Sequence, residues 1–360
     1  MSGCSISSDS VAAAAFGVYS SLNFRVPIGK YTILASFVLS KGELLKVISL
    51  ATGSKCLPTS KFSDEGDALH DSHAEVLARR GAVRWFLEEV QRTHSGGFDS
   101  PWIKRNVEGK YEMNGDVQVH MYISTVPSSF QGQEMAELKD SAVSSPLPPN
   151  TPARGRNNYS LYGVLRTKPG RADSPSTLCM SCSDKIARWN VLGFQGALAS
   201  NFLYPLYIAT LVIGEVDAGM QSMVKEDCER ALWKRLDVLH HSLPPRFNIN
   251  KPAIRFAQLP FIHSSTSLGV TSSCSDSLCW IGDSLNPAEV LINGIKRGVP
   301  PKHQHNPKFR PQLSKVSLFH LCERIAALIG NRTLISNNQC TNINLRNLYY
   351  KESLVLSQGG

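Results

Sequence analysis

The amino-acid sequence predicts a layered α/β fold, because segments with helical spacing alternate along the chain with segments typical of buried strands. Residues 74–90 place apolar side chains at the spacing of an amphipathic helix. Residues 117–126 (VQVHMYISTV) alternate as a strand does, and residues 207–214 (YIATLVIG) form a short apolar run of strand length. Helices and strands in this order pack as helical layers against a central sheet.

Other segments fit the same arrangement. We expect a helix at residues 10–22, a β-hairpin from residues 31–39 and 44–49, a short strand at residues 161–166 and a helix at residues 183–192. A loop containing Gly53, Pro58 and Gly66 follows the hairpin.

The second half of the chain is predicted to be less regular. Residues 141–157 are rich in Ser, Pro and Arg and indicate a surface linker, whereas residues 239–304 have few periodic runs. Residues 315–328 restore a helical pattern, with Val316, Phe319, Leu321 and Ile325 facing inward. We find no internal repeat, so one domain with an irregular C-terminal half is expected.

Composition narrows the class of protein. The 360 residues are 42% hydrophobic and carry a formal charge of +9, which fits a polyanionic partner but also a protein that is merely basic. Nine cysteines without a hydrophobic leader favour a reducing compartment, so we expect the cytoplasm or the nucleus. The longest apolar stretch, residues 202–213, is far shorter than the roughly 20 residues that cross a bilayer, so no membrane association is expected.

Two short motifs offer metal-site chemistry. His73-Ala74-Glu75 opens the predicted helix, where a histidine can bind zinc and a glutamate can transfer protons, although about one such pair per chain is expected by chance. Cys179-Met180-Ser181-Cys182 is a C-x-x-C that precedes a helix, whose N-terminus favours thiolates. Spacing alone leaves three interpretations of this second motif open: a metal site, a redox pair and two buried thiols.

Longer stretches carry a more specific resemblance. Residues 69–80 (LHDSHAEVLARR) and 180–196 (MSCSDKIARWNVLGFQG) resemble the two zinc segments of adenosine deaminases that act on RNA and tRNA. Shorter matches lie at residues 51–57 (ATGSKCL), 165–173 (LRTKPGRAD) and 314–319 (SKVSLF). The KPGR element is similar to the tRNA branch, so the chain is identified as a member of the tRNA-specific adenosine deaminase 1 family.

The resemblance implies a function and a fold. It covers residues 10–353 as one deaminase domain and implies a cytidine-deaminase-like fold with a central mixed sheet flanked by helices. His73 and Cys182 would bind zinc, and Glu75 would pass a proton from zinc-bound water to the leaving ammonia. The implied reaction converts adenosine to inosine in tRNA, next to an alanine anticodon.

The resemblance also implies a buried inositol hexakisphosphate, an anion that only a cage of cations can hold in a core. The matching positions of the cage are Arg79, Arg80, Lys185, Arg188, Trp189 and Lys296. Asp71 and Lys168 would connect this cage to the zinc site. Judged without the resemblance, Arg79 and Arg80 fit a solvated helix face instead.

The chain departs from the family pattern at two places. Ser128 stands where the family has its third zinc ligand, a cysteine, and a serine hydroxyl is a poor zinc ligand. Residues 349–360 begin like the family's last helix and then end, which suggests a shortened C-terminus. Three explanations are open: a variant gene model of an active enzyme, an inactive RNA-binding paralogue, and an enzyme that uses Cys179 as the substitute ligand. A cytidine or free-nucleoside deaminase is a further alternative, which the length of the chain disfavours.

Overall fold

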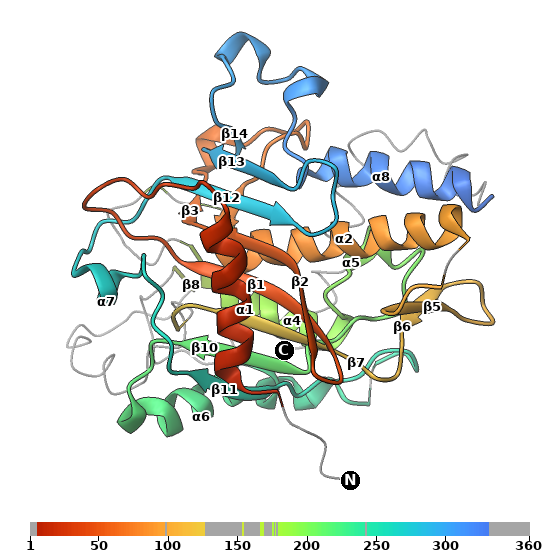
Figure 1. Ribbon diagram of the computed structural model, residues 1–360, viewed down its shortest axis with the longest axis horizontal. Helices are drawn as coiled ribbons and strands as arrows, with labels where there is room; N and C mark the ends of the chain where they lie inside the picture. The colour runs from red at the N-terminus through yellow and green to blue at the C-terminus, as the bar shows by residue number, and fades with distance from the viewer. Residues whose placement is uncertain are drawn as a thin grey trace.

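A mixed eight-stranded sheet forms the centre of the protein in the computed structural model (Figure 1). The structure describes residues 6–97, 99–126, 153–154, 166–168, 175, 177, 179–241 and 243–330. The strands of the sheet, in spatial order, are β11 (Ala253–Ala257), β10 (Thr210–Gly214), β7 (Val117–Ile123), β1 (Leu34–Lys41), β2 (Leu44–Thr52), β12 (Asp276–Ile281), β13 (Ala288–Ile292) and β14 (Ile295–Lys296). β7, β10 and β11 are mutually parallel, and the other neighbours are antiparallel.

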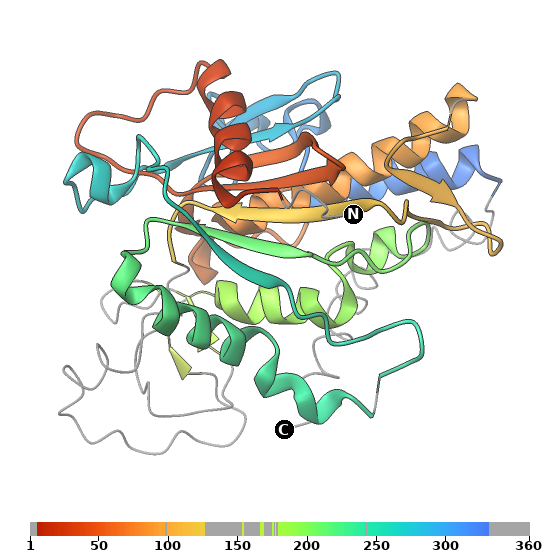
Figure 2. The same ribbon diagram turned by 60° about the horizontal axis from the view of Figure 1, so that its bottom comes forward.

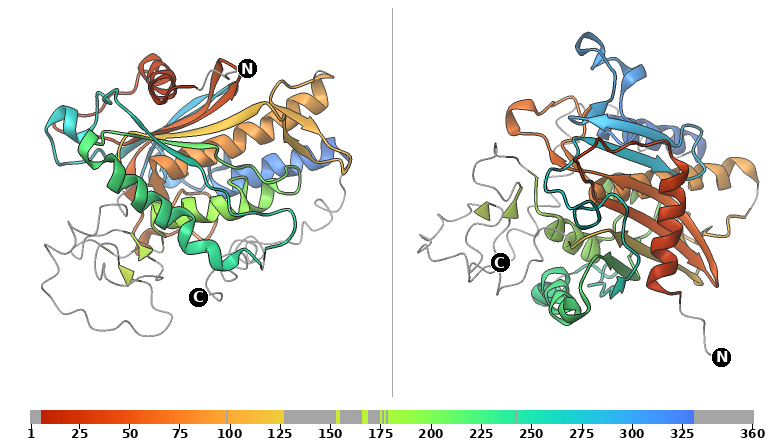
Figure 3. Two further views of the ribbon diagram at one scale, coloured as in Figure 1. Left: turned by 90° about the horizontal axis from the view of Figure 1, so that it is seen from below. Right: turned by 60° about the vertical axis from the view of Figure 1, so that its left-hand side comes forward.

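Helices cover both faces of this sheet (Figures 2 and 3). The α-helices are α1 (Ser8–Ser21), α2 (Ala74–Gly96), α4 (Cys182–Leu192), α5 (Gly196–Ala199), α6 (Gln221–Leu232), α7 (Ser265–Leu268) and α8 (Lys315–Leu328). Short 3₁₀ helices are η1 (Thr59–Lys61), η2 (Ala218–Met220), η3 (Lys234–Leu239), η4 (Pro301–His303) and η5 (Pro307–Phe309). Helix α1 packs on one face, and α2 packs on the other against β1, β2 and β12.

The alternation of side chains along β1 explains the two layers. Leu34 and Val38 belong to the apolar cluster beneath α1, whereas Ala35, Phe37 and Leu39 belong to the larger cluster beneath α2. Because successive residues of a strand point to opposite faces, a strand buried on both sides carries apolar residues on each of them. The predicted central mixed sheet with flanking helices is therefore confirmed.

Most of the predicted elements are present. The helices expected at residues 10–22, 74–90, 183–192 and 315–328 are α1, α2, α4 and α8, and the expected hairpin is β1 with β2. The expected strands at residues 117–126 and 207–214 are β7 and β10. Most of the predicted linker at residues 141–157 and of the strand at residues 161–166 lies outside the described residues.

Three expectations need correction. Residues 239–304 are not irregular, because β11 joins one edge of the sheet and β12 to β14 extend the other. The expected loop after the hairpin contains β3 (Ser54–Cys56), which pairs with β4 (Asp71–His73). The predicted inward face of α8 was partly wrong: Leu318 and Cys322 are buried, while Val316 and Phe319 are half-buried, since the helix packs on α2 from a slightly different side.

Two further pairs of short strands lie outside the main sheet, namely β5 (Ile103–Arg105) with β6 (Tyr111–Met113), and β8 (Ala153–Arg154) with β9 (Arg166–Thr167). Among the described residues, the helices are too short or too polar to cross a membrane.

Candidate active site

His73 and Glu75 are positioned where the short strand β4 turns into α2. His73 is the N-cap of α2, and Glu75 lies in its first turn with 4% of its surface exposed. Gly53 stabilises this junction, because its carbonyl oxygen accepts a hydrogen bond from the Ala74 amide at 3.0 Å. Gly53 has φ +145°, and a Cβ atom there would overlap the carbonyl oxygen of Ser72. Glycine at position 53 therefore allows β3 and β4 to approach closely enough to form the site.

Cys182 is the first residue of α4, on the other side of the site. The Ser181 side chain caps this helix by accepting from the Asp184 amide at 3.1 Å. Cys182 has 1% of its surface exposed, and its sulfur accepts a hydrogen bond from Lys168 Nζ at 2.6 Å. The helix N-terminus and the Lys168 ammonium each favour the thiolate form of Cys182, the form that binds zinc.

Asp71 connects the two halves of the site. Its Oδ1 atom accepts from the His73 amide at 3.0 Å and from His73 Nδ1 at 2.8 Å. Its Oδ2 atom accepts from Lys168 Nζ at 3.3 Å and from Lys185. A single buried carboxylate thus orients the histidine of α2, the lysine beside Cys182 and a lysine of α4.

The charges at this centre determine its protonation. Burial alone would raise the pKa of Asp71, but Lys168, Lys185 and His73 lower that pKa well below its usual value. Burial would lower the pKa of Lys168, yet Asp71 and the Cys182 sulfur raise it well above the usual lysine value. Burial, followed by the charge of Glu75, raises the pKa of the Cys182 thiol. Glu75 therefore lies close enough to Cys182 and Lys168 to interact with both electrostatically.

The residues present fit a zinc ion in part. Because Nδ1 of His73 is engaged by a carboxylate, Nε2 is the nitrogen that this side chain offers to a metal, an arrangement usual for metal-binding histidines. Cys182 supplies a sulfur donor. Residue 128, the third expected position, lies outside the described residues.

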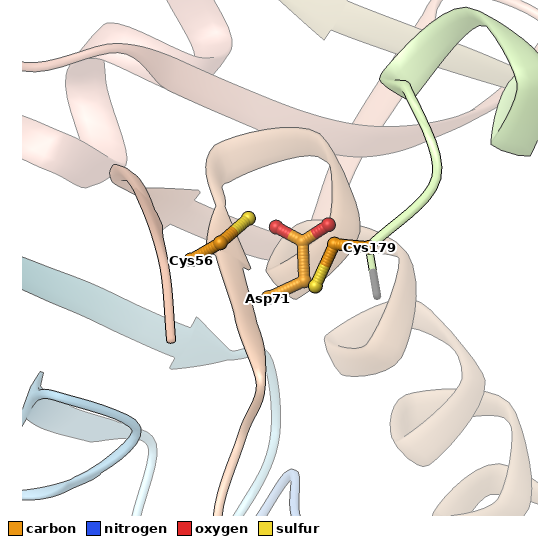
Figure 4. Close-up of side chains that lie close together, drawn as sticks. All are labelled: Cys56, Asp71 and Cys179. Carbon is orange, nitrogen blue, oxygen red and sulfur yellow. The ribbon is translucent and has the colours of Figure 1, made fainter. Parts of the chain in front are cut away.

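Cys179 has a different neighbour from the one its motif suggests. Its sulfur, the Cys56 sulfur and an oxygen of Asp71 all lie within 4.8 Å of one another (Figure 4). Cys182, the other cysteine of the C-x-x-C motif, instead accepts a hydrogen bond from Lys168. A hydrogen bond from Cys56 lowers the pKa of Cys179, and that bond together with burial raises the pKa of Cys56. The sequence offered no direct sign of this pairing, since Cys56 belongs to no cysteine motif.

The cations expected around an inositol phosphate lie on neighbouring elements. The guanidinium of Arg79 sits 5.7 Å from the ring centroid of Trp189, which joins α2 to α4. The Nε atom of Arg80 donates to the Leu313 carbonyl at 2.6 Å, and Lys296 forms an ion pair with Glu289 at 3.3 Å. The five expected cations, Arg79, Arg80, Lys185, Arg188 and Lys296, are all half-buried. Arg79 and Arg80 are therefore less exposed than a solvated helix face, the interpretation that their positions favour without the resemblance.

Comparisons with known proteins agree with this geometry. The model of the adenosine-deaminase (editase) domain matches residues 49–356. The chain is 33% identical over 312 residues to the tRNA-specific adenosine deaminase 1 of Drosophila melanogaster, which covers 81% of this chain and 74% of the relative. It is 27% identical over 333 residues to the protein of the same name from Schizosaccharomyces pombe, covering 84% of this chain and 80% of the relative. The Drosophila double-stranded RNA-specific editase Adar is 31% identical over 248 residues, or 62% of this chain and 34% of the relative. The chain therefore belongs to the adenosine-deaminase (editase) domain family and is a hydrolytic adenosine deaminase.

Proposed function

We propose that this protein deaminates adenosine to inosine in a tRNA, using zinc bound by His73 and Cys182. The observation that carries the proposal is the Asp71 centre, which ties the N-terminus of α2 to the N-terminus of α4 through Lys168. His73, Glu75 and Cys182 are thereby held on two rigid helices, as a catalytic constellation requires. The names of the relatives favour tRNA as the substrate. As the specific target we propose the adenosine beside an alanine anticodon, which the resemblance implies.

The chemistry follows from the residues of the chain. A bound zinc ion supplies a water of lowered pKa, close to neutrality. Glu75 lies in the first turn of α2, buried and close to the positive charge of Lys168, so it can carry a proton from the attacking water to the departing amine. Asp71 fixes the orientation of His73 but does not touch the substrate in this proposal.

A basic loop at residues 296–310 offers a surface for an RNA substrate. Residues 296–310 contain no acidic residue, and Lys302 and Lys308 are exposed within them. Figure 1 shows this segment projecting from the body between β14 and α8. Exposed lysines on a projecting loop suit the phosphate backbone of an RNA. Action on tRNA is consistent with the cytoplasm or the nucleus as the place of work.

We also propose that Arg79, Arg80, Lys185, Arg188 and Trp189 hold inositol hexakisphosphate, with Lys296 at the edge of the cage. Several half-buried cations gathered near Trp189 offer the charge-assisted hydrogen bonds that a highly charged anion needs. Asp71 and Lys168 would transmit the position of this anion to His73 and Cys182. Native mass spectrometry of the purified chain is expected to show the bound mass, and a chain without any bound polyphosphate would contradict this part of the proposal.

A second candidate function is RNA binding without catalysis, and Ser128 is the observation that favours it. With serine at the third position, His73 and Cys182 are the recognisable ligands, unless Cys179 substitutes. Such a site would bind zinc weakly, while the basic surface would still bind tRNA.

The test compares zinc content, tRNA binding and inosine formation in the same preparation. The proposal expects bound zinc by elemental analysis and inosine in tRNA that disappears in Glu75→Gln, a loss of about a hundredfold or more. Glu65→Gln, at an exposed glutamate of the neighbouring loop, is the matched control and should keep full activity. Salt-sensitive tRNA binding with neither zinc nor inosine would instead establish the second candidate.

The role of residues 296–310 is tested separately. Lys302→Glu with Lys308→Glu should weaken tRNA binding and reduce its salt dependence by about one unit of slope per lost contact. Lys104→Glu, at an exposed lysine of β5, is the control. Equal effects of the two changes would show that this loop does not contact the RNA.

A further inference from the structure

Cys56 and Cys179 meet between the two segments that carry His73 and Cys182. Cys56 lies in β3, directly opposite Asp71 of β4 in the pairing of these strands. Cys179 lies on the segment that enters α4, and its amide donates a hydrogen bond to Thr177 Oγ1 at 3.1 Å. The two sulfurs and Asp71 lie within 4.8 Å of one another, as the three side chains in Figure 4 show.

A metal ion is not the best explanation of this cluster. The Asp71 carboxylate already accepts hydrogen bonds at both oxygens, from His73 on one and from Lys168 and Lys185 on the other. A divalent cation would have to displace two ammonium groups and then remain beside them, against their charge repulsion. Without the carboxylate, the cluster is a pair of thiols.

The two thiols lie close enough for a cross-link to form after a modest movement. Their sulfur atoms are within 4.8 Å of each other. Cys179 is buried and Cys56 is partly exposed, which leaves a small oxidant a route to the pair from one side. Both residues lie on short segments and not in the middle of a helix. A sulfur on such a segment moves more easily to the roughly 2.0 Å separation of a disulfide.

We propose that Cys56 and Cys179 form a reversible disulfide when the protein meets hydrogen peroxide, linking β3 to the entry of α4. The partly exposed Cys56 attacks a peroxide oxygen as its thiolate, the O–O bond breaks, and a sulfenic acid forms while hydroxide leaves and takes up the thiol proton as water. The Cys179 thiolate then attacks the Cys56 sulfur, the S–O bond breaks, and the departing hydroxide takes up the second thiol proton as water while the S–S bond forms. Both sulfurs are oxidised and the peroxide is reduced. A dithiol reductant reverses the link by exchange.

The cross-link has a direct bearing on the site. Cys56 Sγ lies 3.5 Å from His73 Nδ1, and Cys179 precedes Cys182 by three residues. Oxidation therefore fastens together the segments that hold the two expected zinc ligands and draws the Cys56 sulfur toward Cys179. The inference depends only on the thiol pair and stands whether or not the chain deaminates tRNA.

The test is disulfide mapping by mass spectrometry on the folded, full-length chain. After mild hydrogen peroxide treatment and alkylation of free thiols, digestion should yield a peptide that joins Cys56 to Cys179 and that disappears after dithiothreitol. Cys56→Ser and Cys179→Ser should each abolish it, whereas Cys228→Ser, at a buried cysteine in α6, should leave it unchanged. The mapping of the unmutated chain stands by itself if a variant fails to fold.

Three results would overturn the proposal. A cross-link between Cys179 and Cys182, or two free thiols at Cys56 and Cys179 after peroxide, would show that the pair does not form. Zinc that falls by one equivalent in the Cys56→Ser, Cys179→Ser double variant would show a metal site instead. Equal zinc in the double variant and the unmutated chain is the expected result.

Discussion

Lys168 Nζ lies 2.6 Å from Cys182 Sγ and 3.3 Å from Asp71 Oδ2, so one buried ammonium bridges a thiol and a carboxylate. Lys168 is the first residue of the KPGR motif, and its side chain lies between Asp71 of β4 and Cys182 of α4. With 5% of its surface exposed, it cannot exchange these partners for water. Together with Lys185, this side chain therefore compensates the buried charge of Asp71.

Lys168→Met should destabilise the fold strongly. Removing one partner of a buried charge pair leaves Asp71 with less compensation, which typically costs about 3–5 kcal/mol. Urea unfolding followed by circular dichroism measures the change. Lys104→Met, at an exposed pair with Glu112, should change the free energy of unfolding by less than about 1 kcal/mol. Similar losses in the free energy of unfolding of both variants would mean that the buried Lys168 pair stabilises the fold no more than the exposed Lys104 pair does.

Ser128→Cys should raise the zinc content of the protein. A cysteine there adds a second thiolate to His73 and Cys182 and completes the three protein donors that catalytic zinc usually has. Inosine formation should rise with it and should vanish again when Glu75→Ala is added. Elemental analysis and inosine assay of the two variants check this. Unchanged zinc in Ser128→Cys would show that residue 128 does not occupy the third ligand position.

Gly53→Ala should damage the site through the backbone. At φ +145° an alanine is strained, and its Cβ would overlap Ser72 and Ser277, so we expect a loss of about 3 kcal/mol or more in the free energy of unfolding. Gly17→Ala, in the exposed face of α1 with nothing within 4 Å, should stabilise the protein by about 0.5–1 kcal/mol. Chemical denaturation of both variants gives the comparison, and a neutral Gly53→Ala would contradict the observed approach of β3 and β4.

His120 should make the stability depend on pH. Burial lowers the pKa of His120 from 6.5 to about 4, while its Nε2 atom lies 2.8 Å from Ser40 Oγ inside the sheet. In the unfolded chain the histidine takes up its proton first, so the free energy of unfolding falls as pH drops from about 6.5 to 4, by at most about 1.4 kcal/mol per pH unit.

The contribution of His120 is isolated by substitution. His120→Gln keeps a hydrogen-bonding group toward Ser40 but cannot titrate, so the decline between about pH 6.5 and 4 should become shallower. His240→Gln, at an exposed histidine, should leave the decline as it is. A pH profile that is the same in His120→Gln as in the unmutated chain would rule His120 out as its source.

The sequence by itself determined the helices and central strands, and it identified the family. Periodicity is a local property, so α2, α4 and α8 and the strands β7 and β10 are visible in the order of residues alone. The family follows from long motifs such as residues 180–196, whose agreement is too extended for chance. His73, Glu75 and Cys182 were candidates for the same reason, since they belong to these motifs.

Only the tertiary structure decided which side chains meet. Strands β11 to β14 are short, and their place at the sheet edges is set by hydrogen bonds to distant strands, so residues 239–304 carry little periodic signal of their own. The ion pairs of Asp71 with Lys168 and Lys185 and the contact of Cys56 with Cys179 join segments far apart in the chain. Such contacts depend on how the layers pack, and spacing along the sequence does not encode them. The C-x-x-C spacing pointed from Cys179 to Cys182, whereas folding brought Cys56 to Cys179 and Lys168 to Cys182.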